Sequence, residues 1–158
     1  ADGSFRDAHG VLQRVLTTTN GTDVAAEEVE RVLGAPAGAD VLGVVDAVAA
    51  KNIDEALLRV RSLAAGKDAR LVLTLLLRIV RGVLLVRVAP SMHAMLQKEY
   101  AEEEWAALTT HARDAKETIN AKLLAALLDA DMKLGNTRMP SVPLELALVE
   151  YFEQLPVA

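Results

Sequence analysis

The chain lacks cysteine altogether and has few aromatic, glycine and proline residues. Without cysteine it has no disulfide framework, no thiol nucleophile and no cysteine-ligated zinc site. Aromatic residues make up 3% of the 158 residues although 52% are hydrophobic, so leucine, valine and alanine must supply the core. These residues are compatible with helices, and only nine glycines and five prolines interrupt them. The composition therefore predicts an all-α fold.

Charge of one sign is not concentrated anywhere along the chain. The net charge is −5, and residues of both signs are scattered through the sequence. The missing basic stripe argues against nucleic-acid contact as the main task of these residues. No signal-peptide pattern is present, so we expect a cytoplasmic protein. The mean hydropathy of +0.24 is high for a water-soluble domain, which leaves two explanations open: a well-filled core, or apolar surface intended for partner chains.

Motifs that carry chemistry are also missing. No Gly-x-x-x-x-Gly-Lys-Ser/Thr loop occurs, so we do not expect these residues by themselves to bind or hydrolyse ATP. His9, His93 and His111 lack a second ligand at metal-binding spacing, and we interpret them as structural. The acidic residues of the segment 99–104 are interpreted as the solvated first turn of a helix rather than a cation site. No catalytic residue and no metal ligand is predicted.

The longest apolar run, Leu71–Val88, imitates a membrane-spanning segment. It contains three arginines, and an arginine near the bilayer centre costs several kcal/mol. From Arg70 to Arg81 the polar residues recur at spacings of four and three, which places them on one face of a helix. The pattern predicts a helix that is buried on most of its circumference in a bundle. A charge at Leu75 or Leu76 should then unfold the domain or destroy its assembly.

Breaks and capping residues divide the sequence into amphipathic helices. Apolar residues recur at helical spacing between successive breaks. Asp40 and Asp68 are predicted N-caps, and Pro143 suits the first turn of the last helix. The expected breaks are Asn20–Gly21, Gly34, the segment 35–40, Asn52, Gly66, Pro90, Arg113–Asp114 and the loop 135–141. The expected inward-facing residues beyond the segment 35–40 include Val41, Val44, Val45, Val48, Ile53, Ala56, Leu57, Val60, Leu63, Met92, Met95, Leu96, Trp105, Leu108, Ile119, Leu123, Leu124, Leu127, Leu128, Leu144, Leu148, Tyr151, Phe152 and Leu155.

Three segments resemble a known family. The first is the segment 1–16, which contains Gly3-Ser4-Phe5-Arg6-Asp7-Ala8; Ser4 is a predicted N-cap and Asp7 stands at the capping-box position. It is similar to the Gly-Ser-x-Arg-Asp-Ala "sensor 2" element of AAA+ clamp-loader ATPases of the bacterial DNA polymerase III gamma/tau family. The segment 22–34 resembles the helix that closes the lid domain of that family. The segment 134–152 resembles its final loop and helix. The family's usual Leu-Ser is replaced by His9-Gly10, and residues 91–118 match only in helical character.

The resemblance implies a domain organisation and a role. Residues 1–34 would be the C-terminal part of an AAA+ lid, 35–40 a linker, and 41–158 a helical oligomerisation domain of about five or more helices, called domain III. Such domains join gamma/tau copies to the delta and delta-prime subunits in a collar. The complex uses ATP to load a sliding clamp onto primed DNA. Arg6 would contact the γ-phosphate of ATP, held with magnesium by another domain of the parent chain. A permanently charged guanidinium suits that task.

A second function class stays open from the sequence. The chain could be a free-standing helical bundle whose groove binds an amphipathic helix or a small hydrophobic ligand. It would then need neither Arg6 nor a neighbouring ATPase domain. An upstream Gly-x-x-x-x-Gly-Lys-Ser/Thr loop in the gene would exclude this alternative.

Overall fold

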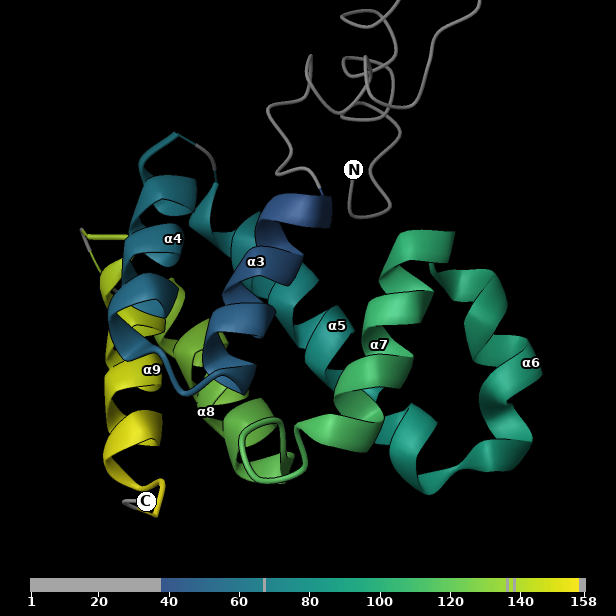
Figure 1. The fold of residues 1–158 in the computed structure, drawn as a ribbon. Helices are drawn as coiled ribbons and strands as arrows, with labels where there is room; N and C mark the ends of the chain where they lie inside the picture. The colour runs from purple at the N-terminus through teal and green to yellow at the C-terminus, as the bar shows by residue number, and fades with distance from the viewer. Residues whose placement is uncertain (1–37, 67, 136, 138, 157–158) are drawn as a thin grey trace, which may run out of the picture. The chain divides into compact units, whose positions relative to one another are not determined.

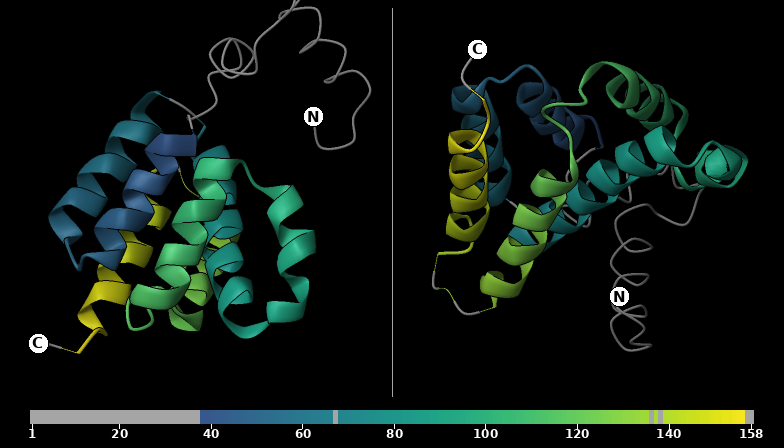
Figure 2. Two further views of the ribbon diagram at one scale, coloured as in Figure 1. Left: turned by 45° about the vertical axis from the view of Figure 1, so that its right-hand side comes forward. Right: turned by 90° about the horizontal axis from the view of Figure 1, so that it is seen from below.

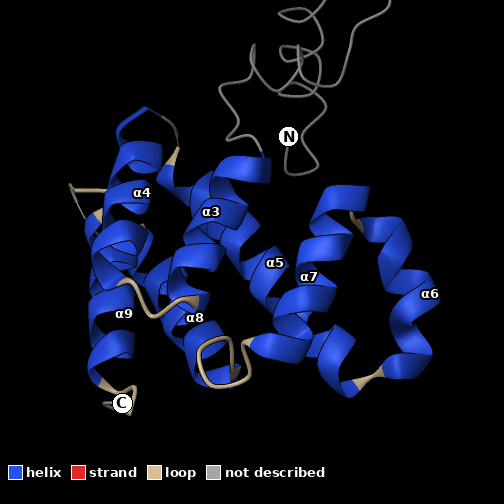
Figure 3. Ribbon diagram, in the orientation of Figure 1, coloured by secondary structure: helices blue, strands red, loops and turns tan. Residues whose placement is uncertain are grey.

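Helices make up nearly all of the structure that we describe. The computed structural model describes residues 38–66, 68–135, 137 and 139–156. Within these residues there are seven α-helices, two 3₁₀ turns and no strand, which confirms the all-α prediction (Figures 1 and 3). The elements are α3 (Gly38–Ala49), α4 (Ile53–Gly66), α5 (Ala69–Val88), η1 (Pro90–Met92), α6 (His93–Leu96), η2 (Gln97–Glu99), α7 (Glu102–Asp114), α8 (Ala121–Leu134) and α9 (Val142–Glu153). The two helices predicted within residues 1–34 lie outside the described residues.

Helix α5 lies at the centre of the bundle. It packs against α3, α4, α7, α8 and the η1–α6 segment. In two orientations α4 and α9 lie at one end of the domain and α6 and α7 at the other (Figures 1 and 2). The helix begins where its cap predicts, because the Asp68 side chain accepts a 2.9 Å hydrogen bond from the Arg70 backbone N–H. It ends at Val88, two residues before Pro90.

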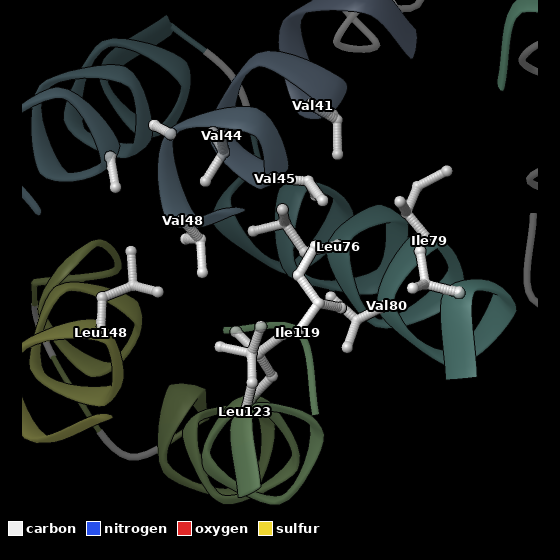
Figure 4. Close-up of a cluster of buried hydrophobic side chains, with 14 of the residues drawn as sticks. Val41, Val44, Val45, Val48, Leu76, Ile79, Val80, Ile119, Leu123 and Leu148 are labelled. Carbon is white, nitrogen blue, oxygen red and sulfur yellow. The ribbon is translucent and has the colours of Figure 1, made fainter. Parts of the chain in front are cut away.

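The core is built from valine and leucine side chains of several helices. Figure 4 shows α3 valines, α5 residues, Ile119, Leu123 and Leu148 pointing toward a common centre. The side chains of α3, α5, α8 and α9 leave a residual cavity of only ≈ 10 Å³ there. That space holds about one water molecule. The interior of this part of the bundle is therefore filled and leaves no room for a small hydrophobic ligand.

The turn between α3 and α4 stops one helix and starts the next. Lys51 has a φ of 58°, in the left-handed region that favours glycine. The Lys51 N–H donates to the Val48 carbonyl, and the Asn52 N–H donates to the Ala47 carbonyl, which is the Schellman pattern. The Asn52 side chain then accepts from the Glu55 N–H at 3.1 Å. Asn52 was predicted as a helix break, and these bonds confirm it and give the reason.

The segment after Pro90 consists of single turns. Helix α6 has four residues between the two 3₁₀ turns. Its Leu96 is fully buried, and the Tyr100 hydroxyl donates a 2.9 Å hydrogen bond to the Arg78 carbonyl. Met95 was expected inside but is 53% exposed. Two anchors, Leu96 and Tyr100, thus hold this irregular segment against α5.

Some predictions about single residues are wrong. Asp40 is not an N-cap, because α3 begins at Gly38; it lies in the first helical turn, where the helix dipole still favours an acid. Leu128 was expected inside but is 50% exposed, since α8 turns Leu123, Leu127 and Ala130 toward the core. Ile119 is buried as expected, although it precedes α8.

Candidate interaction surface

The candidate interaction surface is built from contacts and exposed side chains of the described residues. Among the residues it describes, no three His, Cys, Asp or Glu side chains gather closely enough to hold a metal ion. In the same part of the chain no helix is long and apolar enough to cross a membrane. Arg6, the predicted ATP contact, and His9 lie outside the described residues.

Two histidines occupy structural positions, as predicted. The Nε2 of His93 donates a 2.7 Å hydrogen bond to the Val86 carbonyl, and its ring meets Trp105 edge to face at a centroid distance of 6.0 Å. The Nε2 of His111 lies 2.8 Å from Asp46 Oδ1, which joins α7 to α3. Each ring is partly buried and has a defined partner. These contacts fix helices relative to one another.

The acidic residues of the segment 99–104 divide between two elements: Glu99 ends η2, whereas Glu102, Glu103 and Glu104 form the first turn of α7, as predicted. The predicted solvation does not hold for Glu104, whose side chain is only 13% exposed. Glu104 accepts a 3.2 Å hydrogen bond from the Ala101 N–H, and its carboxylate lies 2.8 Å from Arg78 Nη2. The same guanidinium donates to the Glu99 carbonyl at 2.8 Å and lies 4.5 Å from the centroid of the Tyr100 ring. Burial raises the pKa of Tyr100, and the charges of Arg78 and nearby Arg81 partly offset that effect. Arg78 therefore fastens the η2–α7 junction to α5.

Arg87 performs a similar task at the other end of α7. Its guanidinium donates to the carbonyls of Ala112 at 3.0 Å, Ile119 at 2.8 Å and His111 at 3.3 Å. Burial lowers the pKa of Arg87 from its ordinary value. The charge lies at the C-terminal end of α7, where the helix dipole favours it, and it joins that end to the Ile119 carbonyl ahead of α8. Sequence reasoning used Arg87 only to argue against a membrane span. A basic residue in the last turn of an apolar helix was the available signal.

Exposed apolar side chains concentrate on one hairpin. Eight large hydrophobic residues are more than one-third exposed in the described structure, and five of them fall between residues 128 and 146. We call these five the hairpin face. The hairpin face consists of Leu128, Met132, Met139, Val142 and Leu146, with exposed fractions from 37% to 72%. The first two lie one turn apart on α8, the last two lie one turn apart on α9, and Met139 lies in the connecting loop.

The geometry of the hairpin brings these residues to one end of it. Helices α8 and α9 run antiparallel and form an extensive mutual contact (Figure 1). The last turns of α8 therefore lie beside the first turns of α9. On α8, Asp129 and Lys133, each next in sequence to a residue of the hairpin face, form an ion pair of 2.5 Å. These two charges already neutralise each other.

Comparison with known proteins identifies the family. No curated protein matches the chain significantly. The family model described as DNA polymerase III subunits gamma and tau, domain III, matches residues 24–156. The match covers every described helix and begins within the segment 1–34 that was predicted to belong to the lid. An all-helical bundle with a filled core and an exposed apolar hairpin is consistent with such a domain. The chain therefore belongs to the DNA polymerase III gamma/tau family and contains its domain III.

Proposed function

We propose that this chain is the assembly portion of a bacterial clamp-loader subunit. Its helical domain would join further gamma/tau copies to the delta and delta-prime subunits, and the complex would load the sliding clamp onto primed DNA in the cytoplasm. The observation that carries the proposal is the match of domain III over residues 24–156. This membership favours assembly over the free-standing binding module, the alternative left open by the sequence.

The physical properties of the domain support this role. An assembly domain must keep its shape while it offers surface to neighbours. The bundle has a filled core around α5, yet it leaves five large apolar side chains exposed on one hairpin. Burying apolar surface is the main driving force of subunit association. Primed DNA and the clamp would be reached only through the whole complex, since the chain carries a net charge of −5.

Mixed assembly tests the proposal directly. The 158-residue chain would be combined with the delta and delta-prime subunits of the same organism and analysed by size-exclusion chromatography with light scattering. The expected result is a species heavier than any single chain that contains all three proteins. Mixtures with an unrelated helical bundle of similar size and charge are the control. If the three proteins elute as separate species at all concentrations, the assembly function is wrong.

Arg6 is proposed as the residue that senses ATP in the intact parent chain. The parent ATPase domain would hold ATP with magnesium, and Arg6 would contact the γ-phosphate; residues 35–40 would pass the resulting lid movement to the collar. The expected effect of Arg6→Ala in the parent chain is loss of ATP-dependent clamp loading with normal subunit assembly. Arg14→Ala is the matched control, because Arg14 is also basic and also lies between the predicted N-cap Ser4 and the expected break at Asn20–Gly21. Equal activity of Arg6→Ala and the unaltered parent would refute this role.

A further inference from the structure

We propose that the hairpin face of α8 and α9 is the surface on which a second copy of this helical domain docks. The inference rests on the proposed assembly function and deepens it, because it names the surface and its occupant. Three observations support it: the concentration of exposed apolar residues, the amount of surface that they offer and the near-neutral charge around them.

The concentration is unusual for the described surface. The other exposed large hydrophobic residues there are single: Leu58 lies on α4, Val88 ends α5 and Met95 lies on α6. Scattered residues of this kind occur on any protein and need no partner. The hairpin face instead places four residues as two i, i+4 pairs on adjacent helices, with Met139 between them in sequence. Residues four apart are neighbours on a helix surface.

The apolar area matches what one side of a subunit contact requires. With exposed fractions of 37–72%, the five side chains leave on the order of 500 Å² of apolar surface in water. A standard interface buries about 800 Å² on each partner, of which roughly 57–65% is non-polar. The hairpin face alone therefore supplies the apolar part of one such contact. Its two methionines adapt their shape to a neighbour more readily than branched side chains do.

The charge around the hairpin face suits an identical partner. Between residues 128 and 146 the sequence has three acids, Asp129, Asp131 and Glu145, and two basic residues, Lys133 and Arg138. The net charge of this segment is −1, and one acid is already paired with Lys133 at 2.5 Å. Two copies can approach here with little repulsion. The first turn of α7 has three successive glutamates, of which Glu104 is paired with Arg78, and the charges of the other two would repel those of a second copy.

The first experiment measures assembly of charged variants of the 158-residue chain. Leu128→Glu and Met132→Glu place a carboxylate inside the proposed contact, whereas Leu58→Glu places one on an exposed α4 position outside it. Light scattering over a concentration series gives the dissociation constant of each variant. We expect Leu128→Glu and Met132→Glu to weaken self-association by at least about tenfold, and Leu58→Glu to leave it unchanged. Thermal melting followed by circular dichroism confirms that each variant is folded.

The absence of cysteine permits a second experiment with the same chain. Single-cysteine variants Met132→Cys and Val142→Cys would be mixed pairwise and treated with a short bismaleimide, beside Val88→Cys and Leu58→Cys. We expect a covalent dimer predominantly when both partners carry their cysteine on the hairpin face. Equal cross-linking of all four variants would overturn the proposed surface.

The outcomes separate this inference from the proposed function. If the unaltered chain self-associates and Met132→Glu associates equally well, the hairpin face is wrong while the assembly function stands. If the unaltered chain is monomeric at every concentration, a second copy is not the occupant, and the inference is overturned. Mixed assembly with delta and delta-prime then decides the proposed function by itself.

Discussion

The two sides of α5 are held in different ways. Toward α3, α4 and α8 the contacts are made by buried valine and leucine side chains, such as Val44, Val80 and Leu123. Toward α6 and α7, apolar contacts are joined by polar anchors in which Arg78 and Arg87 bind carbonyls and a carboxylate. The first side tolerates exchange among similar apolar residues, whereas the second depends on particular donors and acceptors. Substitutions on the two sides should therefore destabilise the domain for different reasons: loss of apolar packing on the first side and loss of hydrogen bonds on the second.

The largest effect is expected from a charge on the apolar side. Leu76 is 2% exposed, and Leu76→Asp would bury a carboxylate without a partner. We expect a loss of more than about 4 kcal/mol in the free energy of unfolding, enough to unfold a domain of ordinary stability. Leu75→Asp, at the neighbouring, partly buried position, should cost clearly less. Urea denaturation followed by circular dichroism measures both, and a folded Leu76→Asp would contradict the placement of α5.

On the polar side the largest effect is expected at Arg87. Arg87→Met keeps the approximate length of the side chain but removes hydrogen bonds to two carbonyls at the end of α7 and to the Ile119 carbonyl before α8. We expect a loss of about 2–4 kcal/mol, because partly buried carbonyls lose charged donors. Arg87→Lys keeps the charge without the planar fork and should recover only part of the loss. Equal stability of Arg87→Met and the unaltered chain would show that the anchor contributes little.

Substitution of two glycines, Gly82 and Gly43, compares how closely side chains pack on the two sides of α5. A Cβ at Gly82 would lie 2.5 Å from Leu108 Cδ2 and 2.6 Å from the Tyr100 hydroxyl, so Gly82→Ala should cost about 1–3 kcal/mol. A Cβ at Gly43 would meet mainly the end of the Arg59 side chain, which can move. Gly43→Ala should therefore be neutral or stabilise by up to about 1 kcal/mol. Melting temperatures of the two variants test the contrast, and a destabilised Gly43→Ala would show that Arg59 is held in place.

A smaller effect is expected from alkaline pH. Tyr100 and Tyr151, one on each side, are the two tyrosines of the chain, and burial raises the pKa of both. A raised pKa means that the folded state retains the proton longer than the unfolded state. Stability from this source is thus complete below the ordinary tyrosine pKa of 10 and falls as pH rises above it. Tyrosine absorbance and circular dichroism should change together in that range. Titration of both tyrosines at pH 10 with unchanged structure would contradict their burial.

The smallest effect concerns the turn that ends α3. Lys51 adopts a left-handed conformation that costs an ordinary residue about 1 kcal/mol. Lys51→Gly should stabilise the domain by roughly 0.5–1 kcal/mol, reduced by loss of the exposed Glu117 ion pair. Lys51→Ala, which loses the ion pair but keeps the strain, separates the two contributions. In thermal melts the melting temperature of Lys51→Gly should exceed those of Lys51→Ala and of the unaltered chain.

Elements whose ends or faces follow from a single local signal could be predicted from the sequence. Asp68 and Pro90 bound α5, and the α3 valines recur at helical spacing, so these elements could be predicted. The prediction failed at Leu128 because the apolar stripe of α8 is wider than the surface that its neighbours cover. Periodicity locates an apolar face but does not tell which part another helix will bury. Leu128, whose burial was wrongly predicted, belongs to the hairpin face. The role of Arg87 could not be predicted because its partners lie 24 to 32 residues away.

The central position of α5 has a mechanical consequence. A helix of 20 residues is about 30 Å long. Helices from both ends of the domain contact α5, although α4 does so less than α3, α7 or α8. A change that bends α5 would therefore disturb the helices at both ends of the domain together.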